Sequence, residues 1–377
     1  MKSEIIVISL TATLAGSLTP LSASEPATQP ALRTQFINHE RWPDNNGVHI
    51  NAHGGGVLFH DGTYYWFGEH KIAGEAGNIA HVGVRCFSST DLYNWTDAGV
   101  ALPVSEDPTS DIAKECIIER PKVIYNQQTK KFVMWFHLEL KGQGYSAART
   151  AVAVADQPTG PFKYLHSLRP NAGAWPLNVT EADQQPGPKN FLQRDFAGGQ
   201  MARDMTLFLD DDGKAYHIAS SEENETLHIS ELSEDYLSFT GRYIRVFPGK
   251  SHEAPAICKH NGRYWMLSSG CSGWAPNAAR SAVADSMLGS WTELGNPCVG
   301  TNPHNNLGPD KTFGGQSTHI FQVAGQSKLL IAMFDIWSPE DAIDGRHIWL
   351  PITFTEDAFK IEWASEWKLP GTPQTSE

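Results

Sequence analysis

The sequence predicts an all-β protein, a single-domain five-bladed β-propeller. Helical periodicity is essentially absent, and one strand–turn–strand unit recurs five times along the 377 residues. The hydrophobic content of 40% is enough for a large core, and 12 tryptophans and 17 phenylalanines suit packing between sheets. A large β-sandwich is the alternative architecture, but it does not explain five recurrences of one unit.

Each unit begins with a small or polar motif, continues through a short apolar run and a tight turn, and ends in an aromatic-rich run. The five apolar runs begin close to Gly54, Arg120, Arg203, Glu253 and Gly315. Three of the turns are strong hairpin signals, because Asn, Asp and Gly tolerate the positive φ of such turns: Asp61-Gly62, Asp212-Gly213 and Asn261-Gly262. These hairpins supply the first two strands of each unit.

A third apolar strand and a short polar turn follow each hairpin. We expect a fourth strand that carries an aromatic residue, for example at residues 91–95, 236–239, 285–291 and 359–363. Four strands in each of five units make a propeller. An insertion rich in Pro, Asn and Gln at residues 169–190 is predicted to be a long loop on the binding face.

The ends of the chain differ from the repeating part. Residues 1–23 begin with Lys2, continue as an apolar run and close with Leu21-Ser22-Ala23, which is typical of a secretory signal peptide. We therefore expect a secreted or periplasmic protein with no membrane span. Residues 24–45 are predicted to be an N-terminal extension, residues 46–367 the propeller, and residues 368–377 a C-terminal tail.

The net charge and the cysteine content limit the classes of partner and the disulfides that we expect. A net charge of −13 argues against nucleic acid and anionic membranes, but is compatible with a neutral glycan. The five cysteines are expected to be small buried hydrophobic residues without metal-site spacing: Cys86, Cys116, Cys258, Cys271 and Cys298. A Cys271–Cys298 disulfide is the alternative for that pair. We expect a monomer.

Five positions should meet at one mouth of the central channel, because the first strand of each blade lines that channel. They are His53, Glu119, Asp204, Glu253 and Gln316. Carboxylates that lie close together repel, so that the pKa of one rises and it can act as a general acid near neutral pH. The alternative for each is a solvated strand end or an ion pair, for instance with Arg120 or Arg203.

At these residues the chain resembles glycoside hydrolase family 43. Glu253-Ala-Pro is similar to the general-acid motif of the family, and Arg203-Asp204-Met-Thr-Leu-Phe to the blade whose carboxylate tunes that acid. The resemblance extends over about residues 50–365. Within the family, the chain most resembles the exo-β-1,3-galactanases. This resemblance lies in the segments His53-Gly-Gly-Gly, Tyr64–Glu69, Glu119–Asn126, Ser269–Asn277 and Phe313–Thr318.

The resemblance implies hydrolysis with inversion, which needs an acid on the leaving oxygen and a base-activated water on the opposite side, with carboxyl groups roughly 6.5–9.5 Å apart. Glu253 is the expected acid, and Asp204 is expected to hold it and raise its pKa. The aspartate that usually serves as base in the first blade is replaced by His53. Gln316 is the first candidate for handling the water and Glu119 the second.

Sugar binding is expected from residues near the channel mouth. Trp274 is the candidate for stacking on the apolar face of galactose, while Asn277 and Arg85 are candidates for its hydroxyl groups. His53 is either a structural channel histidine or a sugar contact. We expect no metal and no cofactor: a channel calcium is compatible with such propellers, but no ligand cluster indicates one.

Three functions compete. The first is release of galactose from the non-reducing end of β-1,3-galactan, the backbone of arabinogalactan. The second is another exo-glycosidase activity, on arabinofuranosides or xylosides, which the missing first-blade aspartate disfavours. The third is a non-catalytic glycan-binding propeller, which has no need of a tuned acid such as Glu253 beside Asp204.

Overall fold

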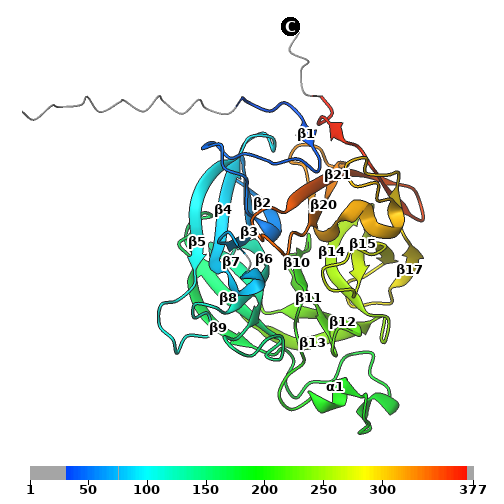
Figure 1. The fold of residues 1–377 in the computed structure, drawn as a ribbon. Coiled ribbons are helices and arrows are strands. Elements are labelled where there is room, and N and C mark those ends of the chain that lie inside the picture. The colour runs from blue at the N-terminus through cyan, green and yellow to red at the C-terminus, as the bar shows by residue number, and fades with distance from the viewer. Residues whose placement is uncertain (1–30, 75, 372–377) are drawn as a thin grey trace, which may run out of the picture.

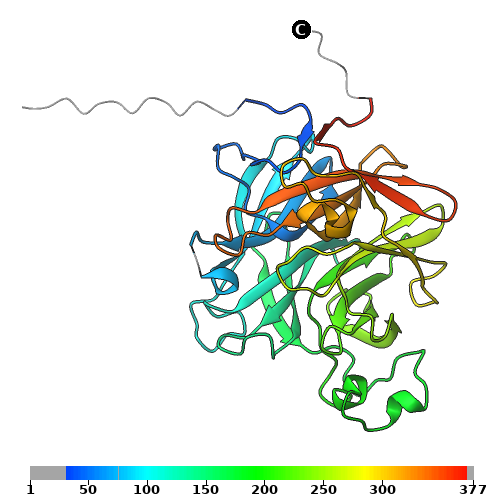
Figure 2. The same cartoon turned by 45° about the vertical axis from the view of Figure 1, so that its right-hand side comes forward.

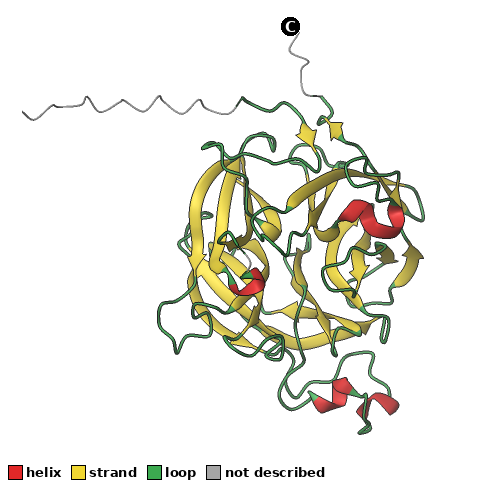
Figure 3. Cartoon of the chain, viewed as in Figure 1, coloured by secondary structure: helices red, strands yellow, loops and turns green. Residues whose placement is uncertain are grey.

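Antiparallel meanders of consecutive strands build the molecule, as a computed structural model shows for residues 31–74 and 76–371 (Figures 1 and 2). Five sheets stand around a common centre, and helix is confined to short segments (Figure 3). The predicted signal peptide at residues 1–23 lies outside the described residues, as do the last six residues of the predicted tail. The described fold is the predicted five-bladed β-propeller.

Each sheet follows chain order from the centre outwards. Blade one comprises β2 (His53–His60), β3 (Thr63–Lys71), β4 (His81–Ser89) and β5 (Thr96–Pro103). Blade two comprises β6 (Ile117–Asn126), β7 (Lys131–Glu139), β8 (Arg149–Ala155) and β9 (Lys163–Leu168). Blade three comprises β10 (Met205–Leu209), β11 (Ala215–Ser221), β12 (Thr226–Leu232) and β13 (Phe239–Val246).

The last two blades complete the ring. Blade four comprises β14 (His252–His260), β15 (Arg263–Gly270), β16 (Arg280–Ala284) and β17 (Thr292–Gly295). Blade five comprises β19 (Gln316–Gln322), β20 (Leu330–Ile336), β21 (Arg346–Phe354) and β22 (Phe359–Glu362), and β18 (Cys298–Val299) adds a parallel strand outside β22. In Figure 1 the first strands β2, β6, β10 and β14 lie around the centre and β5, β9, β13 and β17 at the periphery.

Three of the four predicted fourth strands begin later than the sequence predicts: β5 at Thr96, β13 at Phe239 and β17 at Thr292. Residues 91–95 and 285–291 form turns, and β5 and β17 follow them. The carboxylate of Asp91 accepts the backbone N–H groups of Tyr93 and Asn94, which stabilises a turn rather than a strand. Tyr93 and Trp95 are buried in that turn, so they mark the entrance to the outer strand rather than its middle. The prediction for residues 359–363 is confirmed by β22.

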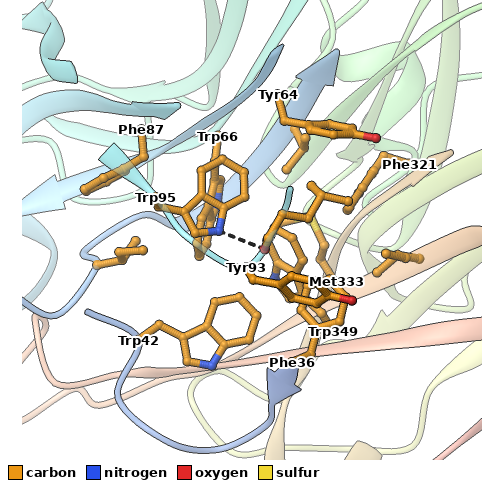
Figure 4. Packing of buried hydrophobic residues seen from close by; sticks show 14 of the residues in the cluster. Phe36, Trp42, Tyr64, Trp66, Phe87, Tyr93, Trp95, Phe321, Met333 and Trp349 are labelled. Carbon is orange, nitrogen blue, oxygen red and sulfur yellow. Dashed lines mark hydrogen bonds between the residues drawn. The ribbon is translucent and has the colours of Figure 1, made fainter. Parts of the chain in front are cut away.

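The described part of the N-terminal extension, residues 31–45, packs against the core. β1 (Phe36–Ile37) pairs antiparallel with β23 (Glu366–Trp367), so that both ends of the described chain meet beside blades one and five. Phe36 and Trp42 are buried against Trp66 and Trp349 (Figure 4). Tilted and edge-to-face aromatic pairs of this kind contribute about 0.5–1.5 kcal/mol each beyond the burial of their area. The described extension therefore packs on blades one and five without adding a strand to either.

The insertion between blades two and three leaves the ring, as Figures 1 and 2 show for α1 (Phe191–Arg194). Its middle lies along the outer strand β13, where Arg245 contacts Asp183 and Asn178. Only its two ends, near Arg169 and Arg194, approach the face on which the functional pocket described below opens. Most of the insertion that was predicted to lie on the binding face therefore lies at the outer edge of blade three.

The cysteines are free. Cys86, Cys116, Cys258 and Cys298 are buried, as predicted, whereas Cys271 is exposed, so the alternative Cys271–Cys298 disulfide is absent. Within the described ranges, no helix has the length and hydrophobicity needed to cross a lipid bilayer.

Candidate active site

A pocket of about 300 Å³ opens at one mouth of the channel. In an antiparallel meander the start of the first strand and the connection from the second to the third strand lie at the same edge of the sheet. Strand starts and such connections from all five blades therefore meet there. The lining residues are Glu69, Asn78, Glu119, Arg120, Tyr145, Asp204, Asn224, Glu253, Cys271, Gly273, Trp274, Gln316 and Trp337.

Bulges at the inner strands aim the functional side chains. The pairing register shifts immediately after His53, Glu119 and Glu253, in β2, β6 and β14. The residue after each of these has a positive φ: 65° at Gly54, 55° at Arg120 and 49° at Ala254. A bulge of this kind re-aims a side chain and is common beside active sites. Blade one uses glycine there, whereas blades two and four hold non-glycine residues in the left-handed region at an energetic cost.

Glu253 has the properties of a general acid. Burial, followed by the negative charge of Asp204, raises the pKa of Glu253 to about 7. Asn224 donates an N–H to Glu253 Oε1 at 2.7 Å. Asn224 stands in the β11–β12 turn after Glu222 and Glu223, and all three have positive φ. The turn therefore holds a neutral donor, rather than a cation, against this carboxyl group.

Asp204 lies directly before β10 and is held by Arg120. The guanidinium donates from Nε to Asp204 Oδ1 at 3.1 Å and from Nη2 to Oδ2 at 2.9 Å. Such a bidentate pair fixes the orientation of a carboxylate. The ion pair that sequence analysis treated as the alternative is thus present, but inside the pocket, where the charge of Asp204 still acts on Glu253.

Glu119 is a carboxylate with an opposite environment. Burial would raise the pKa of Glu119, but hydrogen bonds and the nearby charge of His137 outweigh it and hold the pKa at about 2. Tyr145 donates its hydroxyl to Glu119 Oε1 at 2.6 Å, and Asn78 Nδ2 donates to the same atom at 3.0 Å. His137 Nδ1 lies 2.9 Å from Glu119 Oε2.

His137 lies between two carboxylates. Its Nε2 is 2.9 Å from Glu139 Oε1, opposite the contact of Nδ1 with Glu119. Burial would lower the pKa of His137, but the two carboxylates raise it to about 9. Because both ring nitrogens face acceptors, the imidazole is protonated near neutral pH and keeps Glu119 ionised.

The orientation of the Gln316 amide follows from its partners. Gln316 Oε1 accepts from Arg120 Nη2 at 2.6 Å and from Trp337 Nε1 at 2.9 Å. Arg and Trp side chains are donors only, so the atom facing them must be the carbonyl oxygen. Gln316 Nε2 donates one hydrogen to Ser269 Oγ at 3.0 Å. Its second N–H has no hydrogen-bond partner among the described residues, in a side chain that lines the pocket.

Two tryptophans form the aromatic part of the wall. Trp274, in the β15–β16 loop, is 45% exposed and thus available for contact with a ligand. Its ring stands edge-to-face with that of Trp337, with centroids 5.7 Å apart. Trp337 in turn lies over the guanidinium of Arg120 at 5.2 Å. Trp274 therefore stands where the sequence predicts it, at the pocket.

His53 lies beneath the pocket rather than in its lining. It is 2% exposed, its Nδ1 is 3.2 Å from Asp335 Oδ1, and it stacks on His347 with centroids 4.5 Å apart. Burial, and then His347, lower the pKa of His53 to about 4, so it is neutral near pH 7. Asp335 Oδ2 also accepts the N–H of Gly54 at 2.7 Å. The group supports the bulge of blade one, and the burial of His53 outside the pocket lining favours the first of its two interpretations, a structural channel histidine.

Asn277 and Arg85 also lie outside the pocket lining. Asn277 accepts from Gly270 N at 2.7 Å and donates to Gly270 O at 2.9 Å, which closes the loop that carries Trp274. Arg85, on β4, donates from Nε to Asp97 at 2.8 Å and contacts His70. Arg85 thus forms an ion pair away from the pocket, contrary to expectation. Asn277 closes the loop and also lines a small cavity that shares Trp274, Gln316 and Trp337 with the pocket, so its contact with sugar stays a prediction.

Comparison with protein families gives a match of residues 51–320 to the model of glycosyl hydrolases family 43. The chain belongs to this family. It is a glycoside hydrolase, as the sequence motifs around Glu253 and Asp204 predict.

Three individual proteins show which members of the family this chain is similar to. A family 43 β-1,3-galactosidase solved with galactodeoxynojirimycin is 52% identical, with 89% of this chain and 100% of that chain covered and a TM-score of 0.83. An exo-β-1,3-galactanase from Phanerochaete chrysosporium, solved with β-1,3-galactotriose, is 31% identical, with 89% and 68% covered and a TM-score of 0.72. A β-D-galactofuranosidase from Aspergillus niger is 31% identical over 116 residues, which are 29% of this chain and only 33% of that protein.

Several residues of the family 43 pocket were not singled out by sequence analysis. They are Glu69, Asn78, Tyr145, Asn224, Cys271 and Trp337. Asn78, Tyr145, Cys271 and Trp337 lie in connections from the second to the third strand of a blade, and Asn224 lies in the same connection of blade three. The topological rule that placed the strand starts also places these connections at the pocket, and would have found them.

Two groups of side chains could offer atoms to a metal. In the pocket, one atom each of Glu119, His137 and Asp204 lie within 4.8 Å of one another, but a protonated His137 has no lone pair to give. The other group, His53 with Asp335 and His347, offers two imidazoles, whereas calcium prefers six to eight oxygen ligands. That this hydrolase needs no metal or cofactor remains a prediction.

Proposed function

We propose that this family 43 hydrolase releases galactose from the non-reducing end of β-1,3-galactan, with inversion at the anomeric carbon. The observation that carries the proposal is the carboxyl of Glu253, whose pKa is raised to about 7, beside the ion pair of Asp204 with Arg120. The solved relatives with β-1,3-galactosidase and exo-β-1,3-galactanase activity support the substrate. A volume of about 300 Å³ is at the lower limit for small-molecule sites, which suits a chain end.

Glu253 acts on the leaving group. Its carboxyl proton passes to the glycosidic oxygen as the bond between that oxygen and the anomeric carbon breaks. The remaining chain leaves as an alcohol, and Glu253 becomes a carboxylate until it takes a proton from solvent. Asp204 raises the pKa of Glu253, which keeps the acid protonated before the reaction. Asn224 fixes the carboxyl by its hydrogen bond.

Gln316 and Glu119 act on the water. The imidic tautomer of Gln316 would carry a hydrogen on Oε1, where Arg120 and Trp337 already donate, so Gln316 stays an amide. Its remaining N–H can hold the water oxygen but cannot remove a proton. Glu119 is ionised: Asn78 and Tyr145 donate to its Oε1 and His137 lies 2.9 Å from its Oε2, which leaves part of its acceptor capacity for a water. Gln316 therefore orients the water, and Glu119 accepts its proton as oxygen attacks the anomeric carbon.

Product analysis tests the proposal. The wild-type protein should release galactose, and no larger product, from linear β-1,3-galactan, initially as the α-anomer by NMR. Glu253→Gln should release almost none. Equal release by both proteins would remove Glu253 from the mechanism. Release only from arabinofuranosides or xylosides would replace the substrate, and binding of galactan without release would indicate a glycan-binding propeller.

We further propose that residues 1–23 direct secretion and that the mature enzyme is a monomer. The apolar run and the small residues that end at Ala23 support the first part. N-terminal sequencing of the exported protein should begin after about residue 23. Light scattering should give the mass of one chain, and a mass of two chains would contradict the second part.

A further inference from the structure

A second depression adjoins the catalytic pocket. It has a volume of about 450 Å³, and its wall includes Tyr145, whose ring also lines the catalytic pocket. Arg203, another wall residue, directly precedes Asp204 in the chain, and Glu223 precedes Asn224. A ligand that fills the catalytic pocket therefore lies beside this depression.

The charged residues of the depression form an alternating chain. Arg194 donates to Asp195 Oδ2 at 2.8 Å and to Glu223 Oε1 at 2.9 Å. Arg203 contacts the other oxygen of Glu223 at 3.2 Å, and Arg169 approaches Asp195 at 3.7 Å. The order is Arg169–Asp195–Arg194–Glu223–Arg203, which begins and ends with a cation. Three arginines against two carboxylates leave one surplus positive charge.

The surplus charge is accessible and out of keeping with the protein as a whole. The side chain of Arg194 is 43% exposed and that of Arg169 24% exposed, so both can meet a ligand. The chain carries a net charge of −13, which repels anions in general. The positive charge at the edge of the catalytic pocket is therefore a local feature. It favours an anion that is attached to a bound substrate rather than a free anion in solution.

Guanidinium groups bind carboxylates and sulfates through their N–H donors. The Nε–Nη2 edge of Arg194 already pairs with Asp195, so an added anion meets the second N–H of Nη1, whose first donates to Glu223. A neutral galactan chain offers no such group, but a side branch on it can. We propose that the arginine-lined depression binds an anionic substituent, a uronate carboxylate or a sulfate ester, carried on a side branch of the galactan near the bond that is cleaved. This rests on the proposed function and adds selectivity among branched chains to it.

Four oligosaccharides test this inference. They are β-1,3-galactotriose, the same trisaccharide with a β-1,6-galactosyl branch on its terminal residue, the same with a β-1,6-glucuronic acid branch, and the trisaccharide sulfated at its terminal O6. We expect kcat/KM at low salt to be about fivefold higher for an anionic than for the neutral branch. The preference should disappear at high salt. The two anionic compounds show whether carboxylate or sulfate is preferred.

Variants assign the preference to the depression. Arg194→Gln should abolish it while hydrolysis of unbranched galactotriose is unchanged, and Arg194→Lys should keep part of it. Arg242→Gln, which removes an exposed arginine of the outer strand β13 that faces Glu231, should change neither. Calorimetric binding of the same compounds to Glu253→Gln gives a readout that does not depend on turnover.

Three results separate the inference from the function on which it rests. Normal hydrolysis of galactotriose with no preference for an anionic branch would overturn the inference alone. A preference that survives in Arg194→Gln would also overturn it. No release of galactose from unbranched galactotriose would instead overturn the proposed function.

Discussion

Glu253 and Glu119 form a natural comparison inside one pocket. Each stands near the start of the inner strand of its blade, each precedes a residue with positive φ, and both face the same cavity. Yet the pKa of Glu253 rises to about 7, while that of Glu119 falls to about 2. The backbone is equivalent, so neighbours make the difference: an anion and an amide for Glu253, and an imidazolium, a hydroxyl and an amide for Glu119. The repeated blade structure places both carboxylates at the pocket, and the neighbouring side chains give them different pKa values and therefore different roles.

The largest effect should come from Glu253→Gln. Loss of the general acid should lower kcat on galactan by about a thousandfold, because nothing else protonates the leaving oxygen. An aryl β-galactoside with a good leaving group needs little protonation, so its hydrolysis should fall far less. Steady-state rates on both substrates, with a thermal melt to show that the variant folds, check this. Equal losses on both substrates would contradict the role of acid.

Glu119→Gln should cost about a hundredfold in kcat, because the water loses its proton acceptor. In contrast to the previous variant, the loss should be the same on galactan and on the aryl galactoside, since every substrate needs the activated water. A loss of activity confined to galactan would mean that Glu119 acts on the leaving group rather than on the water. Gln316→Leu, which removes the orienting N–H, is the companion variant and should show the same lack of dependence on leaving group.

His137→Gln should remove a pH dependence of stability. The folded pKa of His137, about 9, exceeds its ordinary value of 6.5, so its contribution is fully present below pH 6.5 and is lost as the pH rises through 9. The wild-type free energy of unfolding should fall by about 3 kcal/mol across this window. The variant should show a flatter profile in urea titrations. Parallel profiles for the two proteins would mean that His137 is neutral.

Asp204→Asn should shift the pH profile of the remaining activity. The alkaline limb of kcat/KM reports loss of the proton from Glu253, near pH 7 in the wild type. Removing the anion lowers the pKa of Glu253, so this limb should move by about one unit to lower pH. An unchanged alkaline limb would mean that burial alone raises the pKa of Glu253.

The sequence predicts the repeat well because hairpin turns and inner-strand hydrophobic runs are local patterns. From these, topology alone places Glu119, Asp204, Glu253 and Gln316 at one pocket. The fourth strands were placed too early because buried aromatics such as Trp95 resemble strand residues, while a neighbouring Asp91 makes a turn. Turn chemistry outweighed β-propensity there.

The environment of each site residue was beyond sequence analysis. Nothing local indicates that Arg120 crosses from blade two to Asp204 of blade three and Gln316 of blade five. Arg85 looks like a pocket residue until Asp97 is seen beside it. Long-range pairing of this kind depends on side-chain paths, which no sequence pattern encodes.

The short pairing of β1 with β23 has a consequence for how the ring resists opening. No strand is exchanged between the first and last blades in the described chain, so the seam between them is fastened from outside, by two residues of each end and by Phe36 and Trp42 inserted behind them. His53 of blade one and Asp335 of blade five meet across the same seam, so a loosened β1–β23 pairing would act on the side chains beneath the pocket.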